Sequence, residues 1–289
     1  MKNYVSPFGS AAYHAASEID HLLDQQFADK VAVVTGSTQG LGLTTVELML
    51  RRGLKGAVIC GRNAEAGMAA AARMSTEQQR VIFQQIDLAN VVDCHSLIAC
   101  TIEEFGSFEI LVNSAGVTSR GGILDGDEAL WDQTFAINAR APFFLIQDAA
   151  HHWREQRKPG TVVNVATITA HGGVPSLTVY AASKAALVTT TKNAAFTLAR
   201  DGIRINALAI GWMDTPAEDV IQKHFHNMPD GWQADVGSEL PAGRLLSMNE
   251  VARWIAHLAS DESGIITGSI IDFDHGVVGV YESTPLPKK

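Results

Sequence analysis

The 289-residue chain has few cysteines, no long apolar run and no excess of basic residues. Its three cysteines, Cys60, Cys94 and Cys100, form no disulfide framework, and their spacing matches no zinc site. No stretch approaches about eighteen uninterrupted apolar residues, so no transmembrane helix is expected. With 31 acidic and 22 basic side chains the net charge is −9, which argues against nucleic acid or an anionic membrane as partner.

The first 28 residues also lack the basic-then-apolar profile of a secretory signal, because they carry acidic side chains such as Glu18 and Asp20. Together with reduced thiols, this predicts a cytoplasmic protein. The histidine pairs at 151–152 and 224–226 have no acidic or cysteine partner at ligand spacing, so we predict no metal site.

Short apolar runs without polar alternation, typical of strands buried on both faces of a parallel sheet, alternate with longer alanine-rich stretches of helical spacing. The expected strands are 31–35, 57–60, 81–86, 110–112, 161–165, 203–209 and 270–273. The expected helices are 41–52, 64–75, 91–105, 127–156, 176–200 and 248–259. This rhythm predicts an α/β fold, a Rossmann-type doubly wound parallel sheet of about seven strands in the order 3-2-1-4-5-6-7.

No Pro- or Ser-rich linker divides the chain, so we expect one dinucleotide-binding catalytic domain over residues 29–276. Residues 1–28 form an extension with a short helix over 11–24, and residues 277–289 form a tail. A long irregular insert, 211–247, interrupts the rhythm, and inserts of this length are commonly lids over a site. Its tryptophans, Trp212 and Trp232, either line the substrate site or form a local core.

The first strand runs directly into Thr35-Gly36-Ser37-Thr38-Gln39-Gly40-Leu41-Gly42, and a helix follows. Gly36 allows a sharp turn, Gly40 allows the backbone to approach a pyrophosphate, and Gly42 allows the helix to pack closely on the strand. The helix N-terminus offers free amides to the phosphates. This turn therefore predicts dinucleotide binding.

The end of the second strand distinguishes the two nicotinamide cofactors. NAD sites place an acidic residue there for the ribose 2′-hydroxyl, whereas an arginine accommodates the 2′-phosphate of NADP. This chain has Arg62 and Asn63 and no carboxylate at that point, which favours NADP(H) over NAD(H).

Tyr180 and Lys184 share one helix face, because residues four apart are neighbours on a helix. A phenol is a poor acid or base at neutral pH, and a nearby ammonium lowers its pKa towards the useful range. The helix follows the fifth strand, at the sheet edge where ligands bind. The pair is therefore the candidate acid/base centre.

In this order and with these spacings, the motifs resemble the short-chain dehydrogenase/reductase family over about residues 28–276. The motifs are the glycine turn, Asp87-Leu88, Asn113-Ser114-Ala115-Gly116, Asn138, Tyr180 to Lys184, Asn206, Gly243-Arg244-Leu245 and Ile266-Thr267-Gly268. The resemblance implies that Tyr180 exchanges a proton with the substrate oxygen, that Lys184 also holds the nicotinamide ribose, and that Asn138 supports a water chain to Lys184. It implies cofactor contacts from Gly36, Ser37, Thr38, Gln39, Gly40, Leu41, Gly42, Arg62, Asn63, Asp87, Leu88, Asn113, Ala115, Gly116, Tyr180, Lys184, Gly211, Met213 and Thr215.

Two positions depart from the family's pattern. Thr167 stands thirteen residues before Tyr180, where the family has a serine. Threonine keeps the hydroxyl that donates to the substrate oxygen, but its methyl group stiffens the side chain and narrows the space beside it. After the sixth strand, Ile210-Gly211 replaces the usual Pro-Gly, ahead of Met213 and Thr215.

The leading interpretation is an NAD(P)-dependent oxidoreductase acting on the carbonyl or secondary alcohol of a small polar molecule, such as a sugar, polyol or keto compound. The alternatives are a 3-oxoacyl thioester reductase and a dinucleotide-binding sensor without catalysis. Residues 176–200 are apolar or small on more faces than one sheet can cover, and residues 142–146 are also apolar. A homo-oligomer, a dimer or tetramer as the resemblance implies, is expected to cover them.

Overall fold

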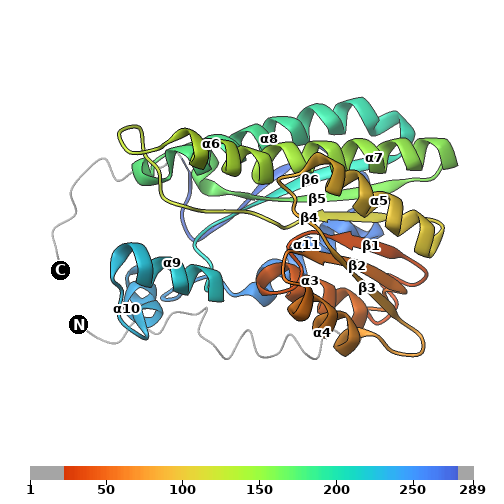
Figure 1. The fold of residues 1–289 in the computed structure, drawn as a ribbon, viewed down its shortest axis with the longest axis horizontal. Helices are drawn as coiled ribbons and strands as arrows, with labels where there is room; N and C mark the ends of the chain where they lie inside the picture. Colours follow the sequence, from red (N-terminus) through yellow and green to blue (C-terminus); the bar gives the residue numbers. More distant parts are fainter. Residues whose placement is uncertain (1–22, 279–289) are drawn as a thin grey trace.

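The computed structural model describes residues 23–278 and contains a seven-stranded, fully parallel sheet (Figure 1). Its strands are β1 (Val31–Val34), β2 (Gly56–Gly61), β3 (Arg80–Gln85), β4 (Ile110–Asn113), β5 (Gly160–Thr167), β6 (Ile203–Ile210) and β7 (Ile270–Phe273). They lie in the order β3-β2-β1-β4-β5-β6-β7, which confirms the predicted Rossmann-type topology. Between β1 and β4 the order reverses, and ligands bind beyond the carboxyl ends of the strands at such a point.

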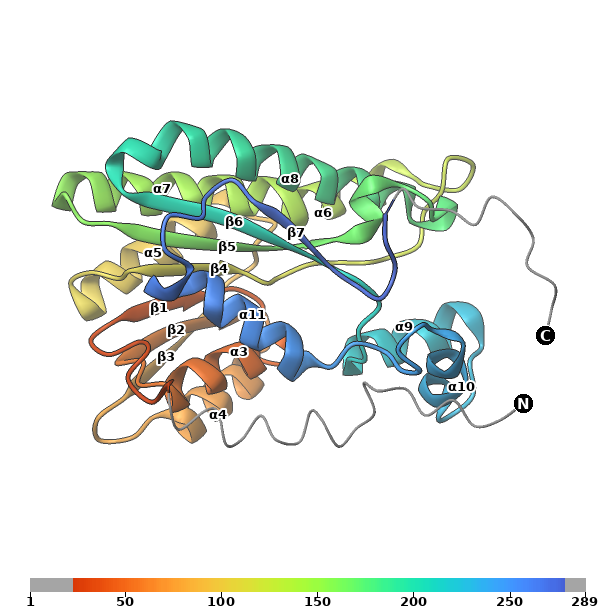
Figure 2. The ribbon, with the colours of Figure 1, turned by 180° about the vertical axis from the view of Figure 1, so that it is seen from behind.

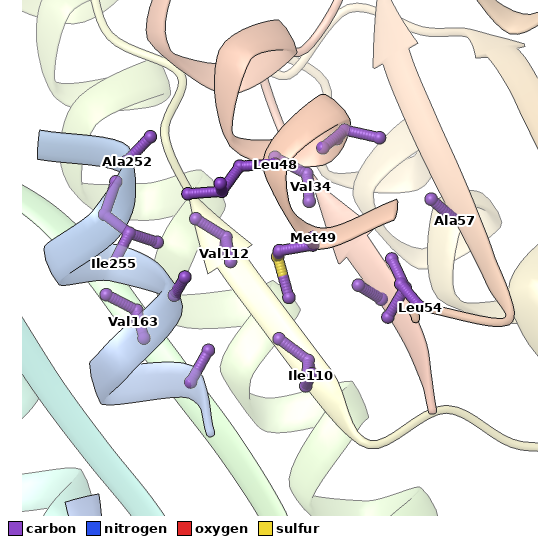
Figure 3. Close-up of a cluster of buried hydrophobic side chains, with 14 of the residues drawn as sticks. Val34, Leu48, Met49, Leu54, Ala57, Ile110, Val112, Val163, Ala252 and Ile255 are labelled. Carbon is purple, nitrogen blue, oxygen red and sulfur yellow. The ribbon is translucent and has the colours of Figure 1, made fainter. Parts of the chain in front are cut away.

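Helices cover both faces of the sheet, as Figures 1 and 2 show. One face carries α3 (Gly40–Arg51), α4 (Ala64–Met74) and α11 (Met248–Ala259). The other carries α5 (Val91–Phe105), α6 (Glu128–Phe135), α7 (Ala141–Gln156) and α8 (Thr178–Leu198). Each face has its own apolar core. In the core drawn in Figure 3, Leu48 and Met49 of α3 and Ile255 of α11 pack against side chains of the central strands.

The helix predicted over 127–156 is interrupted by a wider turn. A π-helical turn, Ala136–Arg140, joins α6 to α7. Such turns insert a residue into the α-helical register and are frequent at functional sites. This turn carries Asn138, which is fully buried.

The insert 211–247 is more regular than predicted, since it contains α9 (Pro216–His226) and α10 (Trp232–Glu239). Thr215 caps α9 by accepting a hydrogen bond from the Glu218 N–H, and Pro216 occupies the first turn. Both helices project from the carboxyl end of the sheet, on the side of the loop after β4 (Figures 1 and 2).

The two tryptophans of the insert stack on each other, with ring centroids 5.5 Å apart. Trp232 is only 1% exposed, and its Nε1 donates to Asp219 Oδ1 over 3.0 Å. Trp232 therefore belongs to a local core of the insert, and Trp212, which is half-buried, borders that core.

Residues 1–22 and 279–289 lie outside the described residues, and with them most of the helix predicted over 11–24 and most of the predicted tail. Across the described residues, no helix has the length and apolar content needed to cross a membrane.

Candidate functional site

The turn between β1 and α3 brings two backbone segments unusually close. Gly36 and Gly40 have φ angles of 62° and 57°, which favour glycine. A Cβ on Gly36 would lie 2.8 Å from the Ala115 Cα, and one on Gly42 would lie 2.4 Å from the Gly36 carbonyl oxygen. A side chain at Gly36 would force the turns after β1 and β4 apart, and one at Gly42 would push α3 away from the turn after β1.

Two hydroxyl groups hold this region together. The Thr35 Oγ1 accepts hydrogen bonds of 3.1 Å from both the Ser114 and Ala115 N–H groups, so it ties the turn after β4 to the end of β1. The fully buried Ser37 hydroxyl donates to the Val34 carbonyl and accepts from the Cys60 N–H. The hydroxyl of Ser37 is thus used within the protein.

The N-terminus of α3 has no side-chain cap, although Gln39 stands at the capping position. By contrast, Asn63 caps α4 and Asn90 caps α5, each through a 3.0 Å hydrogen bond from a backbone N–H. A Cβ on Gly40 would meet nothing within 4 Å. Free amides, the positive end of the helix dipole and open space suit a pyrophosphate, so the turn fits a dinucleotide.

Arg62 follows β2 and is exposed, and its guanidinium makes no hydrogen bond or ion pair within the described part of the chain. No carboxylate lies in the segment Cys60 to Asn63. The Asn63 side-chain oxygen is occupied by its capping bond. Asp87, after β3, accepts from the Ala89 N–H over 3.0 Å. The remaining predicted contacts in this half of the site are the half-buried Thr38 and Leu88, and the buried Leu41.

Tyr180 lies in the first turn of α8, beside the end of β5. Its hydroxyl is hydrogen-bonded to Thr167, whose Oγ1 also lies 3.2 Å from the Thr169 Oγ1. Burial raises the pKa of Tyr180 to about 12, and the hydrogen bond from Thr167 opposes that rise. The structure therefore brings together Tyr180 and the residue that replaces the family's serine.

Lys184 is 3% exposed, and its Nζ donates to the Val165 carbonyl over 2.8 Å. Burial lowers the pKa of Lys184 to about 8, so this amine exchanges its proton close to neutral pH. The charge of Arg120 lowers the pKa of Tyr180.

Asn138 is held by the backbone of the loop after β4. Its Oδ1 accepts from the Val117 N–H, and its Nδ2 donates to the Val117 carbonyl, both over 2.9 Å. Its Nδ2 also donates to the Ser183 Oγ over 3.0 Å. A Cβ on Gly116 would lie 3.4 Å from both Asn138 Oδ1 and Lys184 Nζ, so these groups surround one small space.

Asn113, at the end of β4, donates through Nδ2 to the Asn164 Oδ1 over 2.8 Å. Its own Oδ1 is buried and has no partner among the described residues. A buried acceptor of this kind is stabilised by a ligand or water that donates to it.

The segment after β6 holds the last predicted contacts. A Cβ on Gly211 would lie 1.8 Å from the Asp274 Oδ1, so a side chain at this position would displace that carboxylate. Met213 pairs with Leu246 in an isolated parallel bridge, and the Thr215 hydroxyl caps α9.

Sequence reasoning missed three polar residues near Tyr180: Arg120, Thr169 and Glu218. The charges of Arg120 and Glu218 both act on the Tyr180 hydroxyl. No motif marks Arg120, because its place beside α9 depends on how the insert packs. His226 of α9 accepts a hydrogen bond from the Arg120 Nε over 3.1 Å. Among the described residues, no group of histidine, cysteine or acidic side chains is suited to hold a metal ion.

Comparisons with known proteins agree with this geometry. The family model described as enoyl-(acyl carrier protein) reductase matches residues 36–278. Cis-4-hydroxycyclohexanecarboxylate dehydrogenase of Sinomonas cyclohexanicum is 32% identical over 259 residues, which cover 89% of this chain and 100% of that protein. Galactitol 2-dehydrogenase of Agrobacterium fabrum is 28% identical, covering 86% of this chain and 97% of its own length.

Among solved structures, a variant of actinorhodin polyketide ketoreductase with NADPH superimposes with a TM-score of 0.81 at 26% identity, covering 88% of this chain and 99% of that one. Members of the family use NAD(P) to interconvert alcohols and carbonyl compounds. The chain belongs to the short-chain dehydrogenase/reductase family and is an oxidoreductase acting on CH–OH or C=O groups.

Proposed function

We propose that this oxidoreductase reversibly reduces a ketone on a small polar molecule, with NADP(H) as cofactor and Tyr180 as general acid/base. The contact between the hydroxyl of the half-buried Tyr180 and Thr167 carries the proposal. It places a proton donor and a second hydroxyl at the carboxyl end of β5, where the dinucleotide turn also opens.

A bound nicotinamide would supply or accept the hydride. In the reducing direction Tyr180 gives its proton to the substrate oxygen, and Thr167 donates a hydrogen bond to the same oxygen. Lys184, with a pKa of about 8, can return a proton to Tyr180. Asn138 bonds to both the loop after β4 and the first turns of α8, and so holds these two segments together beside Tyr180 and Lys184.

Replacing Tyr180 with phenylalanine should remove the proton donor and little else. We expect Tyr180→Phe to lower kcat by about 10²–10⁴-fold, the usual contribution of general acid–base catalysis. Nucleotide affinity, measured by fluorescence titration, should stay nearly unchanged. Turnover at the parent rate would show that the assigned mechanism is wrong.

Thr167 allows a test of the hydroxyl group at constant shape. Thr167→Val keeps the branched Cβ and removes the donor, so we expect kcat to fall about 10²–10³-fold, as for an oxyanion donor. Thr167→Ser keeps the hydroxyl and should retain activity. Parent-like kinetics in the valine variant would exclude Thr167 from polarising the substrate.

The preference for NADP(H) rests on Arg62, whose guanidinium is exposed beside the predicted 2′-phosphate position and faces no competing carboxylate in the adjoining segment. Asn63 caps α4 through its side-chain oxygen and has only a neutral amide N–H to offer a phosphate, so Arg62 is the cationic group of this segment. A guanidinium binds phosphate through two charge-assisted hydrogen bonds.

Arg62→Gln should therefore raise KM for NADPH by about 10- to 100-fold and leave KM for NADH unchanged, since such bonds contribute about 1.5–3 kcal/mol. Arg73→Gln, on the far part of α4 where Arg73 pairs with Glu47, is the matched control. An unchanged KM for NADPH in the Arg62 variant would contradict the proposed preference.

The substrate class is to be identified with a panel assayed with NADH and NADPH in parallel. The panel includes ketones, sugars, polyols such as galactitol, and the hydroxy acid cis-4-hydroxycyclohexanecarboxylate, after the names of the relatives. Preferred turnover of 3-oxoacyl thioesters would favour the first alternative. Tight nucleotide binding without turnover of any compound would favour a sensor.

We further propose a homo-oligomer built on α7 and α8, in the cytoplasm. A groove between α6, α7 and α8 includes Phe135 and Phe143 in its lining, and Phe196 on α8 is 89% exposed. Free thiols support a reducing compartment: burial raises the pKa of Cys60 to about 12, so this thiol resists oxidation.

Phe196→Glu should lower the molar mass measured by light scattering, because a charge in a subunit interface is costly to bury. Val92→Glu, on the exposed start of α5, should leave the mass unchanged. A parent protein that already has the mass of one chain would contradict the proposed oligomer.

A further inference from the structure

We propose that Arg120 binds an anionic group of the substrate, so that this enzyme acts on hydroxy acids and their oxo counterparts. The inference rests on the proposed function and assigns a substrate class to the same site. It follows from where the guanidinium lies, which of its hydrogens are used, and what its acidic neighbour already binds.

Arg120 leaves the loop after β4 beside the start of α8. The Gly121 N–H donates to the Ser176 carbonyl over 2.9 Å, and the Val179 N–H donates to the Gly121 carbonyl over 3.2 Å. These two bonds fix the loop to residues 176–179, the segment that directly precedes Tyr180. The backbone next to Arg120 is thus anchored by the scaffold of the site.

The side chain of Arg120 reaches from this anchor towards α9. Its Nε donates to His226 Nε2, and its Nη2 lies 3.9 Å from the Glu218 Oε1. The side chain is 14% exposed. The charge of Arg120 lowers the pKa of Tyr180 and that of Glu218 raises it, so both charges lie close enough to act on the catalytic hydroxyl.

Most of the guanidinium's hydrogen-bonding capacity is unused. A guanidinium carries five N–H donors. Within the described residues, Nε bonds to His226 and Nη1 bonds to the Thr118 carbonyl over 3.0 Å, and Nη2 has no acceptor at hydrogen-bond distance. Partly buried donors of this kind favour a ligand that accepts several bonds at once, and a carboxylate does so in the plane of the guanidinium.

Glu218 does not already fill that role. Its Oε1 accepts from Trp212 Nε1 over 2.9 Å and from Gln222 Nε2 over 2.7 Å. It also lies in the first turn of α9, where the helix dipole favours a negative charge. The carboxylate is thus stabilised inside the insert, and its distance from Arg120 is beyond a hydrogen bond. Glu218 therefore balances the charge of Arg120 without a hydrogen bond, whereas a substrate carboxylate could accept bonds from the N–H groups of Arg120 that remain unused.

The test measures binding without turnover. Cyclohexanecarboxylate and its primary amide, cyclohexanecarboxamide, are titrated by calorimetry into the NADPH-loaded protein. We expect the acid to bind the parent at least about tenfold more tightly than the amide, as charge-assisted hydrogen bonds imply. Arg120→Met should abolish this preference, and Arg120→Lys should restore part of it because the charge remains.

Arg154→Met is the matched control, since Arg154 pairs with Asp201 at the end of α7 and should not affect either ligand. Equal affinities for acid and amide, no binding of the acid, or a preference that survives Arg120→Met would each overturn the proposal. Binding does not need hydride transfer, so these outcomes leave the Tyr180 mechanism standing. Conversely, a fully active Tyr180→Phe would overturn the mechanism and not the anion site.

Discussion

The proposed mechanism depends on a buried ammonium group that has no carboxylate partner among the described residues. The Nζ of Lys184 donates to one backbone carbonyl, and desolvation lowers its pKa from 10.5 to about 8. The unfolded chain keeps that proton up to about pH 10.5, so the charged lysine costs on the order of 3 kcal/mol of folding stability at neutral pH. The cost is complete below pH 8 and disappears as the pH rises towards 10.5. The same burial that destabilises the folded state brings the pKa of this amine into the range where it exchanges protons near neutral pH.

The rest of the fold positions groups around that lysine through departures from regular structure. The π-helical turn rotates Asn138 so that its amide bonds the Val117 backbone on one side and Ser183 on the other. Gly116 leaves the space between Asn138 and Lys184 open. The close approach of Gly36 to Ala115 brings the dinucleotide turn to the same edge of the sheet. Each departure is local, and together they bring the π-helical turn, the loop after β4 and the dinucleotide turn to the same edge of the sheet.

Much of this arrangement could be predicted from sequence, because its signals are local. Apolar runs marked every strand within about two residues, and the topology followed from their alternation with helices. The turn at Gly36 to Gly42 and the spacing of Tyr180 and Lys184 are likewise readable within short stretches of the chain. The break at 136–140 could not be predicted, since its residues have ordinary helical character and tertiary contacts decide its register.

The placement of Arg120 beside Tyr180 was equally hidden, because it depends on α9, which lies about a hundred residues further along the chain. The hydrogen-bond partner of the Lys184 amine could not be predicted for a similar reason. Four-residue spacing places two side chains on one face, but the Lys184 amine turns to the Val165 carbonyl. Helical spacing determines which side chains share a face, and the nearby acceptors determine which hydrogen bonds those side chains make.

The cofactor and acid/base groups belong to the sheet and its adjoining turns, whereas Glu218 and His226 belong to the insert. Arg120 joins the two parts, so the position of α9 sets the field at the Tyr180 hydroxyl. A substrate anion that neutralised Arg120 would remove the charge that lowers the pKa of Tyr180. The phenol would then hold its proton more firmly, which would make Tyr180 a weaker acid in carbonyl reduction and, once deprotonated, a stronger base in alcohol oxidation. The proposed anion site would therefore couple substrate recognition to the protonation state of Tyr180 through one guanidinium.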